Sequence, residues 1–175
     1  MVLDRKQKGI VLASLIVYFL VIVWVIMFKM GLVPLEEFSA RGPYFIPFQF
    51  VYNIYLENNL HLLPRQIIVM IVNFLMFIPF GMGIGVLTTN KTLRVILALV
   101  LGSCFEITQF ILHFGVFDMW DIILNMVGVF YGYEVIKVYQ TKFNVEKTIK
   151  VLKVLIVIGI FVFIFGMAFA IYRLF

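Results

Sequence analysis

Long apolar runs separated by short polar segments dominate this sequence. A membrane-spanning helix needs about 20 mostly apolar residues, and five runs come close to that length: residues 10–28, 66–87, 95–112, 121–138 and 154–171. The first run is longer than the roughly 7–15-residue apolar core of a signal peptide, so we read it as a membrane helix. The pattern predicts an all-α fold, a polytopic bundle of about five transmembrane helices that forms one domain over residues 1–175.

The segment between the first two runs, residues 29–64, has a different character. Prolines exclude a straight transmembrane helix there, because they break helical hydrogen bonding: Pro34, Pro43, Pro47 and Pro64. Aromatic and branched residues at positions 44–55 nevertheless make the segment too apolar for a solvated loop. Two interpretations remain open, an extracellular segment in the membrane interface and a loop that caps the helix bundle.

Composition and charge agree with a membrane protein. Hydrophobic residues make up 64% of the chain and charged residues 13%, whereas a soluble domain carries roughly 25% charged residues. The net charge of +5 comes from lysines and arginines that border the apolar runs. Such residues set membrane topology, so no nucleic-acid partner is predicted. The single cysteine, Cys104, lies inside an apolar run and cannot form an intrachain disulfide.

The distribution of basic residues predicts the orientation. With five spans and a cytoplasmic N-terminus, ten of the fourteen lysines and arginines fall on the cytoplasmic side: Arg5, Lys6, Lys8, Lys91, Arg94, Lys137, Lys142, Lys147, Lys150 and Lys153. We interpret Lys91 and Arg94 as part of a short basic turn. The positive-inside rule selects this topology. It places the 29–64 segment, the 113–120 connection and the C-terminus outside.

Polar side chains concentrate in one stretch, residues 106–133. Six of them lie within twenty residues of apolar sequence: Glu106, Gln109, His113, Asp118, Asp121 and Asn125. Ionisable groups at membrane depth are costly and mark functional sites. Each half of the set follows i, i+3, i+7 spacing, which forms one stripe on a helix. Because the 113–120 connection is short, the two runs should be antiparallel neighbours whose stripes face each other.

Depth counting adds Asn73 of the second run to this set. At a rise of about 1.5 Å per residue, Asn73 lies roughly 10 Å, Glu106 roughly 9 Å and Asn125 roughly 6 Å from the outer ends of their runs. Three helices therefore bring polar side chains to a similar level. The predicted ligand-binding set comprises Asn73, Glu106, Gln109, His113, Asp118, Asp121 and Asn125.

Three interpretations of this cluster remain open. A polar clasp would join Asn73, Glu106, Gln109 and Asn125 by hydrogen bonds across the bundle. An outward-opening pocket with both aspartates at its rim and Glu106 at its floor would suit a lipid-linked or amphiphilic ligand. A metal site would use Glu106, His113, Asp118 and Asp121, but the spacing matches no metal motif, and neither a metal nor a cofactor is predicted. Asp118 is also a residue type that caps a helix, with Asp121 then in the first turn.

Short motifs at these positions resemble the VanZ-like family of bacterial membrane proteins. Together they cover residues 44–134 in the family's order: Phe45-Ile-Pro-Phe48, Asn73 with Phe77-Ile-Pro-Phe-Gly81, Glu106 with Gln109, and Asp118, Asp121, Asn125, Gly128 and Gly132-Tyr133. The family often has an arginine three residues before the first aspartate, where this chain has Gly115. If that arginine pairs with a carboxylate or a ligand phosphate in relatives, this protein must use another cation or none.

The resemblance implies a protein of the bacterial cytoplasmic membrane. The family takes its name from an accessory protein of glycopeptide resistance clusters that is associated with reduced susceptibility to teicoplanin. Teicoplanin carries an acyl chain and acts on cell-wall precursors at the outer membrane face. Our leading hypothesis is therefore an accessory envelope protein that binds, among membrane lipids, a lipoglycopeptide or a lipid-linked cell-wall precursor.

Two other functional hypotheses follow from the same residues. A membrane enzyme acting on a polyprenyl phosphate or a glycolipid could use Glu106, Asp118 or Asp121 as a catalytic base or as cation ligands. A small transporter is less favoured, because the two halves of the chain show no inverted repeat.

Overall fold

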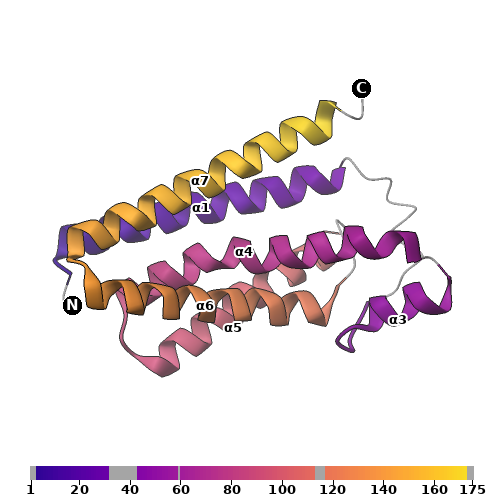
Figure 1. Ribbon diagram of the computed structural model, residues 1–175, viewed down its shortest axis with the longest axis horizontal. Helices are drawn as coiled ribbons and strands as arrows, with labels where there is room; N and C mark the ends of the chain where they lie inside the picture. The colour runs from indigo at the N-terminus through magenta and orange to yellow at the C-terminus, as the bar shows by residue number, and fades with distance from the viewer. Residues whose placement is uncertain (1–2, 32–42, 59, 113–116, 173–175) are drawn as a thin grey trace.

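The computed structural model of this protein is a bundle of long helices with one short helix at its end (Figure 1). It describes residues 3–31, 43–58, 60–112 and 117–172. The long helices are α1 (Arg5–Gly31), α4 (Leu63–Leu87), α5 (Lys91–Ile111), α6 (Met119–Lys142) and α7 (Val145–Tyr172). The short helix α3 (Gln49–Leu56) and a 3₁₀ turn, η1 (Leu60–Leu62), precede α4. The residues that the structure describes form no strand.

Four of the five predicted apolar runs each lie within one long helix, and the run 95–112 extends one residue beyond the end of α5. In the described part of the chain, four helices have the length and hydropathy needed to cross a membrane: Arg5–Val23, Ile67–Leu87, Lys91–Ile111 and Met119–Lys142. The fifth run lies in α7, which has 28 residues, and its membrane crossing stays a prediction. The predicted all-α membrane bundle is confirmed.

The long helices begin before their apolar runs. The start of a helix is set by a polar capping residue rather than by the first apolar residue. Helix α5 starts at Lys91, where the Asn90 side chain accepts a hydrogen bond from the Leu93 N–H at 3.1 Å. Such a side-chain cap satisfies one of the N–H groups that a helix start leaves unpaired. The expectation that Lys91 and Arg94 belong to a turn is therefore wrong, since both lie in the first turn of α5.

Glycines bring α4 and α6 into close backbone contact. These two helices share the most extensive interface in the bundle. A methyl group added to Gly128 would collide with the carbonyl of Phe74, and one added to Gly132 with the carbonyl of Ile78. Gly81 of α4 faces the α6 backbone in the same way. Gly128 and Gly132 are four residues apart, a spacing of small residues that is common where membrane helices pack closely.

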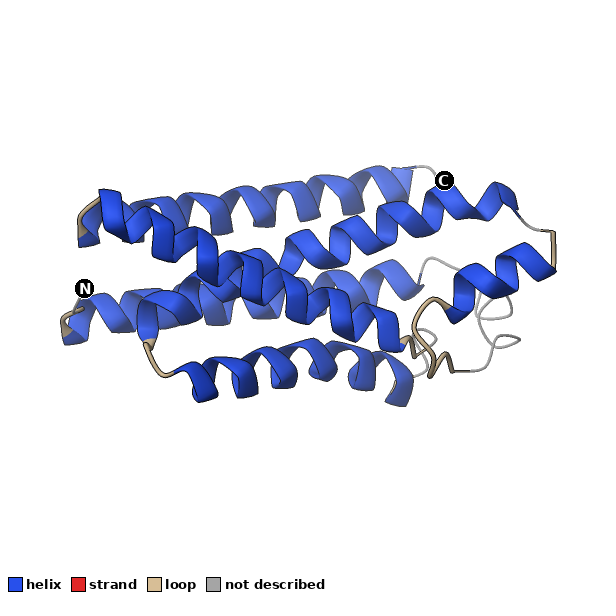
Figure 2. Cartoon of the chain, turned by 60° about the horizontal axis from the view of Figure 1, so that its bottom comes forward, coloured by secondary structure: helices blue, strands red, loops and turns tan. Residues whose placement is uncertain are grey.

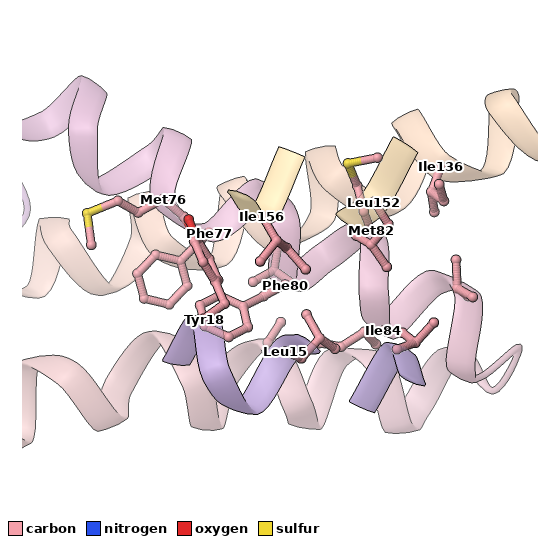
Figure 3. Packing of buried hydrophobic residues seen from close by; sticks show 14 of the residues in the cluster. Leu15, Tyr18, Met76, Phe77, Phe80, Met82, Ile84, Ile136, Leu152 and Ile156 are labelled. Carbon is pink, nitrogen blue, oxygen red and sulfur yellow. The ribbon is translucent and has the colours of Figure 1, made fainter. Parts of the chain in front are cut away.

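Helices α1 and α7 form a pair that packs on α4. The buried Tyr18 hydroxyl of α1 donates a hydrogen bond to the Met76 carbonyl of α4 at 3.0 Å. Its ring packs on Phe80 with the ring centroids 5.1 Å apart, and Figure 3 shows these side chains together in the core. Gly159 of α7 leaves room for the same tyrosine ring. Tyr18 thus links three helices at one point.

The two ends of the bundle differ in character. The start of α1, the α4–α5 turn and the α6–α7 connection lie at one end, and α3 lies at the other (Figures 1 and 2). Exposed basic residues occur at the first end, among them Arg5, Lys6, Lys8, Lys91 and Lys142. This arrangement agrees with the predicted order of the spans. Which end faces the cytoplasm stays a prediction.

The glycine contact generates a stability prediction. Substitution of Gly132→Ala forces α4 and α6 apart, and overpacking of this kind costs about 1–3 kcal/mol. We expect a lower unfolding temperature in detergent micelles. Gly9→Ala is the matched control, because no atom lies within 4 Å of an added methyl group there. Equal unfolding temperatures for the two variants would contradict the close-packing account.

Candidate functional site

The candidate site is built around the N-terminus of α6. Asp118 is the N-cap residue, with an extended backbone, and its carboxylate accepts a hydrogen bond from the Trp120 N–H at 2.8 Å. Its carbonyl oxygen accepts from the N–H groups of Asp121, at 3.1 Å, and Ile122. Asp121 lies in the first helical turn, where a negative charge interacts favourably with the helix dipole. The prediction that Asp118 caps this helix is confirmed.

Two further N–H groups at this N-terminus are satisfied by distant parts of the chain. The Asp118 N–H donates to the carboxylate of Glu106 in α5 at 3.2 Å. The Met119 N–H donates to the Tyr44 carbonyl at 2.9 Å, and the Tyr44 N–H donates to the Phe117 carbonyl at 2.8 Å. Tyr44 and Asp118 therefore form an isolated parallel bridge. The start of α6 is closed by α5, by the segment before α3 and by its own cap.

Burial defines the electrostatics of this cap. Glu106 is 3% exposed and Asp118 is 9% exposed. A carboxylate removed from water is unfavourable unless it is hydrogen-bonded, and the Asp118 N–H supplies that bond to Glu106. Asp121 and Asp118 lie close enough to repel a negative charge on Glu106. Burial raises the pKa of the Asp118 carboxyl, and the hydrogen bond from Trp120 opposes that rise.

Asn125 joins α6 to α5 two turns below the cap. Its side chain is 2% exposed, and its amide nitrogen donates to the Gly102 carbonyl of α5 at 3.3 Å. An added methyl group at Gly102 would press against Met126 and the Ile122 carbonyl, so the glycine permits this close approach. No side-chain hydrogen bond joins two members of the predicted clasp among the described residues, although Asn125 does bond across the helices. The partners of Asn125 and Glu106 are backbone groups rather than other predicted side chains.

The remaining predicted site residues are less closely tied to this cluster. Gln109 and Asn73 are half-buried, and neither side chain hydrogen-bonds to another described residue. Asn73 lies one turn from Phe77 on the same face of α4, and Phe77 packs on Phe105 with the ring centroids 5.3 Å apart. His113 and Gly115 lie outside the described residues. In the described ranges, no three histidine, cysteine, aspartate or glutamate side chains are arranged to hold a metal ion.

An aromatic strap, residues 44–48, packs over this end of α6. The Phe48 ring lies 3.8 Å from the Trp120 ring and the Phe45 ring 5.6 Å from the Phe117 ring, measured between centroids. Phe48 has a φ of 64°, a left-handed conformation that is rare for a bulky residue. The loop-cap interpretation is therefore correct for the strap. The sequence reasoning missed Tyr44 and Trp120 as site residues, although the family motif at Phe45 pointed to the strap.

Comparison with known proteins places this site within a family. The sequence profile of the VanZ/LLP1 family matches residues 15–140. The chain belongs to the VanZ/LLP1 family. A relative, Protein VanZ from Enterococcus faecium, is 28% identical over 142 residues, which cover 79% of this chain and 80% of that protein. No solved structure shows significant similarity.

The VanZ/LLP1 match includes every predicted site residue. It extends from the middle of α1 to near the end of α6 and stops before α7. The strap, the glycine contact between α4 and α6, and the cap of α6 all lie inside it. The resemblance predicted from the short motifs is confirmed, and motif residues of the strap, α4 and α5 contact α6 between its N-terminal cap and Gly132.

The raised pKa of Asp118 predicts a pH-dependent stability. The folded state holds the Asp118 proton more tightly than the unfolded state, whose aspartate pKa is about 3.9. This contribution to the free energy of unfolding is therefore complete below that pKa and is lost as the pH rises through the folded-state pKa. Asp118→Asn keeps a cap oxygen without the charge. We expect its stability relative to wild type to increase across that pH range.

Unfolding temperatures in detergent, measured at a series of pH values, check this expectation. Glu146→Gln is the control for the loss of one carboxylate, because Glu146 is exposed in the first turn of α7. It should follow the pH dependence of wild type. Parallel curves for wild type and Asp118→Asn would show that Asp118 does not contribute.

Proposed function

We propose that this VanZ/LLP1 protein is an accessory protein of the bacterial cell envelope that lowers susceptibility to glycopeptides. It binds an amphiphilic ligand at the outer leaflet, either a lipoglycopeptide such as teicoplanin or a lipid-linked cell-wall precursor. The observation that carries the proposal is the buried Glu106 carboxylate at the capped start of α6, beneath the aromatic strap. Polar anchors and apolar surface occur together there, as an amphiphile requires.

An apolar hollow on α4 and α6 supports this ligand class. It has a volume of about 250 Å³ and is lined by Ile67, Met70, Ile71, Phe74 and Leu124. Pockets for drug-sized ligands measure roughly 300–1,000 Å³, so the hollow suits part of an acyl chain rather than a large head group. Leu124 lies one turn from Trp120 on α6. An acyl chain in the hollow would leave its polar head near the strap.

The proposed orientation places this end of the bundle outside the cell. The opposite end carries the exposed basic residues at the start of α1 and around the helix connections. The positive-inside rule assigns such an end to the cytoplasm. The N-terminus is then cytoplasmic, α7 ends outside, and the strap faces the compartment in which cell-wall precursors are exposed.

A susceptibility assay tests the proposed function. Wild type, Glu106→Gln and Asp121→Asn are produced at matched membrane levels in a sensitised bacterial host, and the minimal inhibitory concentration of teicoplanin is measured. Glutamine can still accept the Asp118 N–H bond, so the cap and the fold should persist. We expect both variants to lose most of the protection, because each replaces a carboxyl group of the cluster by an amide.

The exposed Glu146→Gln variant is the matched control and should protect like wild type. If Glu106→Gln and Asp121→Asn also protect like wild type, the cluster has no role in teicoplanin susceptibility. Vancomycin, a glycopeptide without the acyl chain, forms a second arm of the assay. Equal protection against both drugs would argue against a contribution of the apolar hollow.

A membrane enzyme acting on a polyprenyl phosphate or a glycolipid is the second candidate function. It is favoured by one observation, the pair of buried carboxylates Glu106 and Asp118, since burial raises the pKa of Asp118 towards the range useful for general acid–base chemistry. Purified protein in lipid would be incubated with such substrates and divalent cations. We expect any turnover to fall by about 100-fold or more in Asp118→Asn. Absence of turnover with several head groups would reject this candidate.

A further inference from the structure

Helix α3 has an exposed apolar face that the proposed function does not use. Tyr52, Tyr55 and Leu56 are 61%, 70% and 62% exposed. Their i, i+3, i+4 spacing places them on one side of the helix. Ile54, at 3% exposed, lies on another side and packs into the protein. The helix therefore already has its protein-facing side, and the aromatic side is left uncovered by the described part of the chain.

A third side of α3 is polar. Gln49, Asn53 and Glu57 follow i, i+4, i+8 spacing and form their own stripe, beside the tyrosine face. One short helix thus presents a protein-facing side, an apolar side and a polar side. A loop in water requires no such division, whereas a helix at a membrane boundary meets protein, lipid and water at once.

The position of α3 also matches a membrane boundary. Before it, the strap is fixed to the N-terminus of α6, whose span begins at Met119. After it, η1 leads directly into α4, whose span begins at Ile67. Both spans therefore start at the level of α3, which lies slanted at this end of the bundle (Figure 1). At the start of α4, the apolar residues Ile67 and Ile68 are also exposed.

We infer that the Tyr52, Tyr55 and Leu56 face of α3 is embedded in the head-group boundary of the bilayer that α4 and α6 cross. Tyrosine suits this layer because its ring is apolar and its hydroxyl is polar. The polar stripe then faces water, and α3 holds the strap at a constant depth. Of the two interpretations of the 44–55 region, the loop cap applies to the strap and the interfacial segment applies to α3. The inference does not depend on the identity of any ligand.

Spin labels test the inference in the full-length protein. Exposed Cys104 is first changed to serine, and single cysteines replace Tyr52, Tyr55 or Asn53 for nitroxide labelling in liposomes. Collision with apolar oxygen and with a water-soluble nickel chelate is then measured. We expect the ratio of oxygen to nickel collisions to be severalfold higher at positions 52 and 55 than at position 53.

Two labelled control positions calibrate the ratio. Val100, exposed in the middle of α5, reports lipid, and Lys142, exposed at the end of α6, reports water. Ratios at 52 and 55 equal to those at 53 and 142 would place the apolar face in water and overturn the inference. Dipolar broadening between labels at position 52 would show that a second copy covers this face, which would also overturn it.

Discussion

The close backbone contact between α4 and α6 is the constraint on which the rest of this structure depends. Gly128 and Gly132 let the carbonyls of α4 lie directly against α6. A helix held so tightly along one side has a fixed rotation about its own axis. That rotation turns Asn125 towards the Gly102 carbonyl of α5 and sets the position of the α6 N-terminus. The glycines are remote from the carboxylates, yet they determine where those carboxylates meet.

The N–H groups at the start of α6 need hydrogen-bond acceptors, and the cap residue alone does not satisfy them all. A helix N-terminus leaves four N–H groups unpaired, and close to a bilayer an unpaired buried group is costly because water is scarce. The Asp118 side chain satisfies one group, Glu106 a second and the Tyr44 carbonyl a third. The family motifs on the strap, α5 and α6 therefore cooperate in one local task. This cooperation explains why a buried acidic residue is tolerated within α5.

The predictable part of the molecule is the part encoded locally. Apolar length identified the long helices, and the residue type of Asp118 identified its cap. The partner of Glu106 was not predictable, because it is a backbone N–H, which every residue except proline possesses. Depth counting placed Asn73 near the level of Glu106, but depth carries no information on rotation about the helix axis. The bridge through Tyr44 spans more than seventy residues of sequence and has no periodic signature.

The distribution of charged residues along the sequence did not reveal the structural role of Arg94. The sequence predicts that Arg94 belongs to a short basic turn, but the residue is buried, with 8% of its surface exposed. Its Nε donates to the Thr88 carbonyl at 2.9 Å, and its guanidinium carbon lies 3.7 Å from the centre of the Tyr133 ring. Helix α5 is thus attached to α6 near both ends, by Arg94 at one and by Glu106 at the other. The strap is joined to this hairpin by two backbone hydrogen bonds and by ring contacts, and its residues 45–48 are exposed. Local opening requires the least free energy where contacts are fewest. The strap should therefore separate from α6 more readily than α5 does, and the left-handed backbone of Phe48 lowers the cost of that separation further.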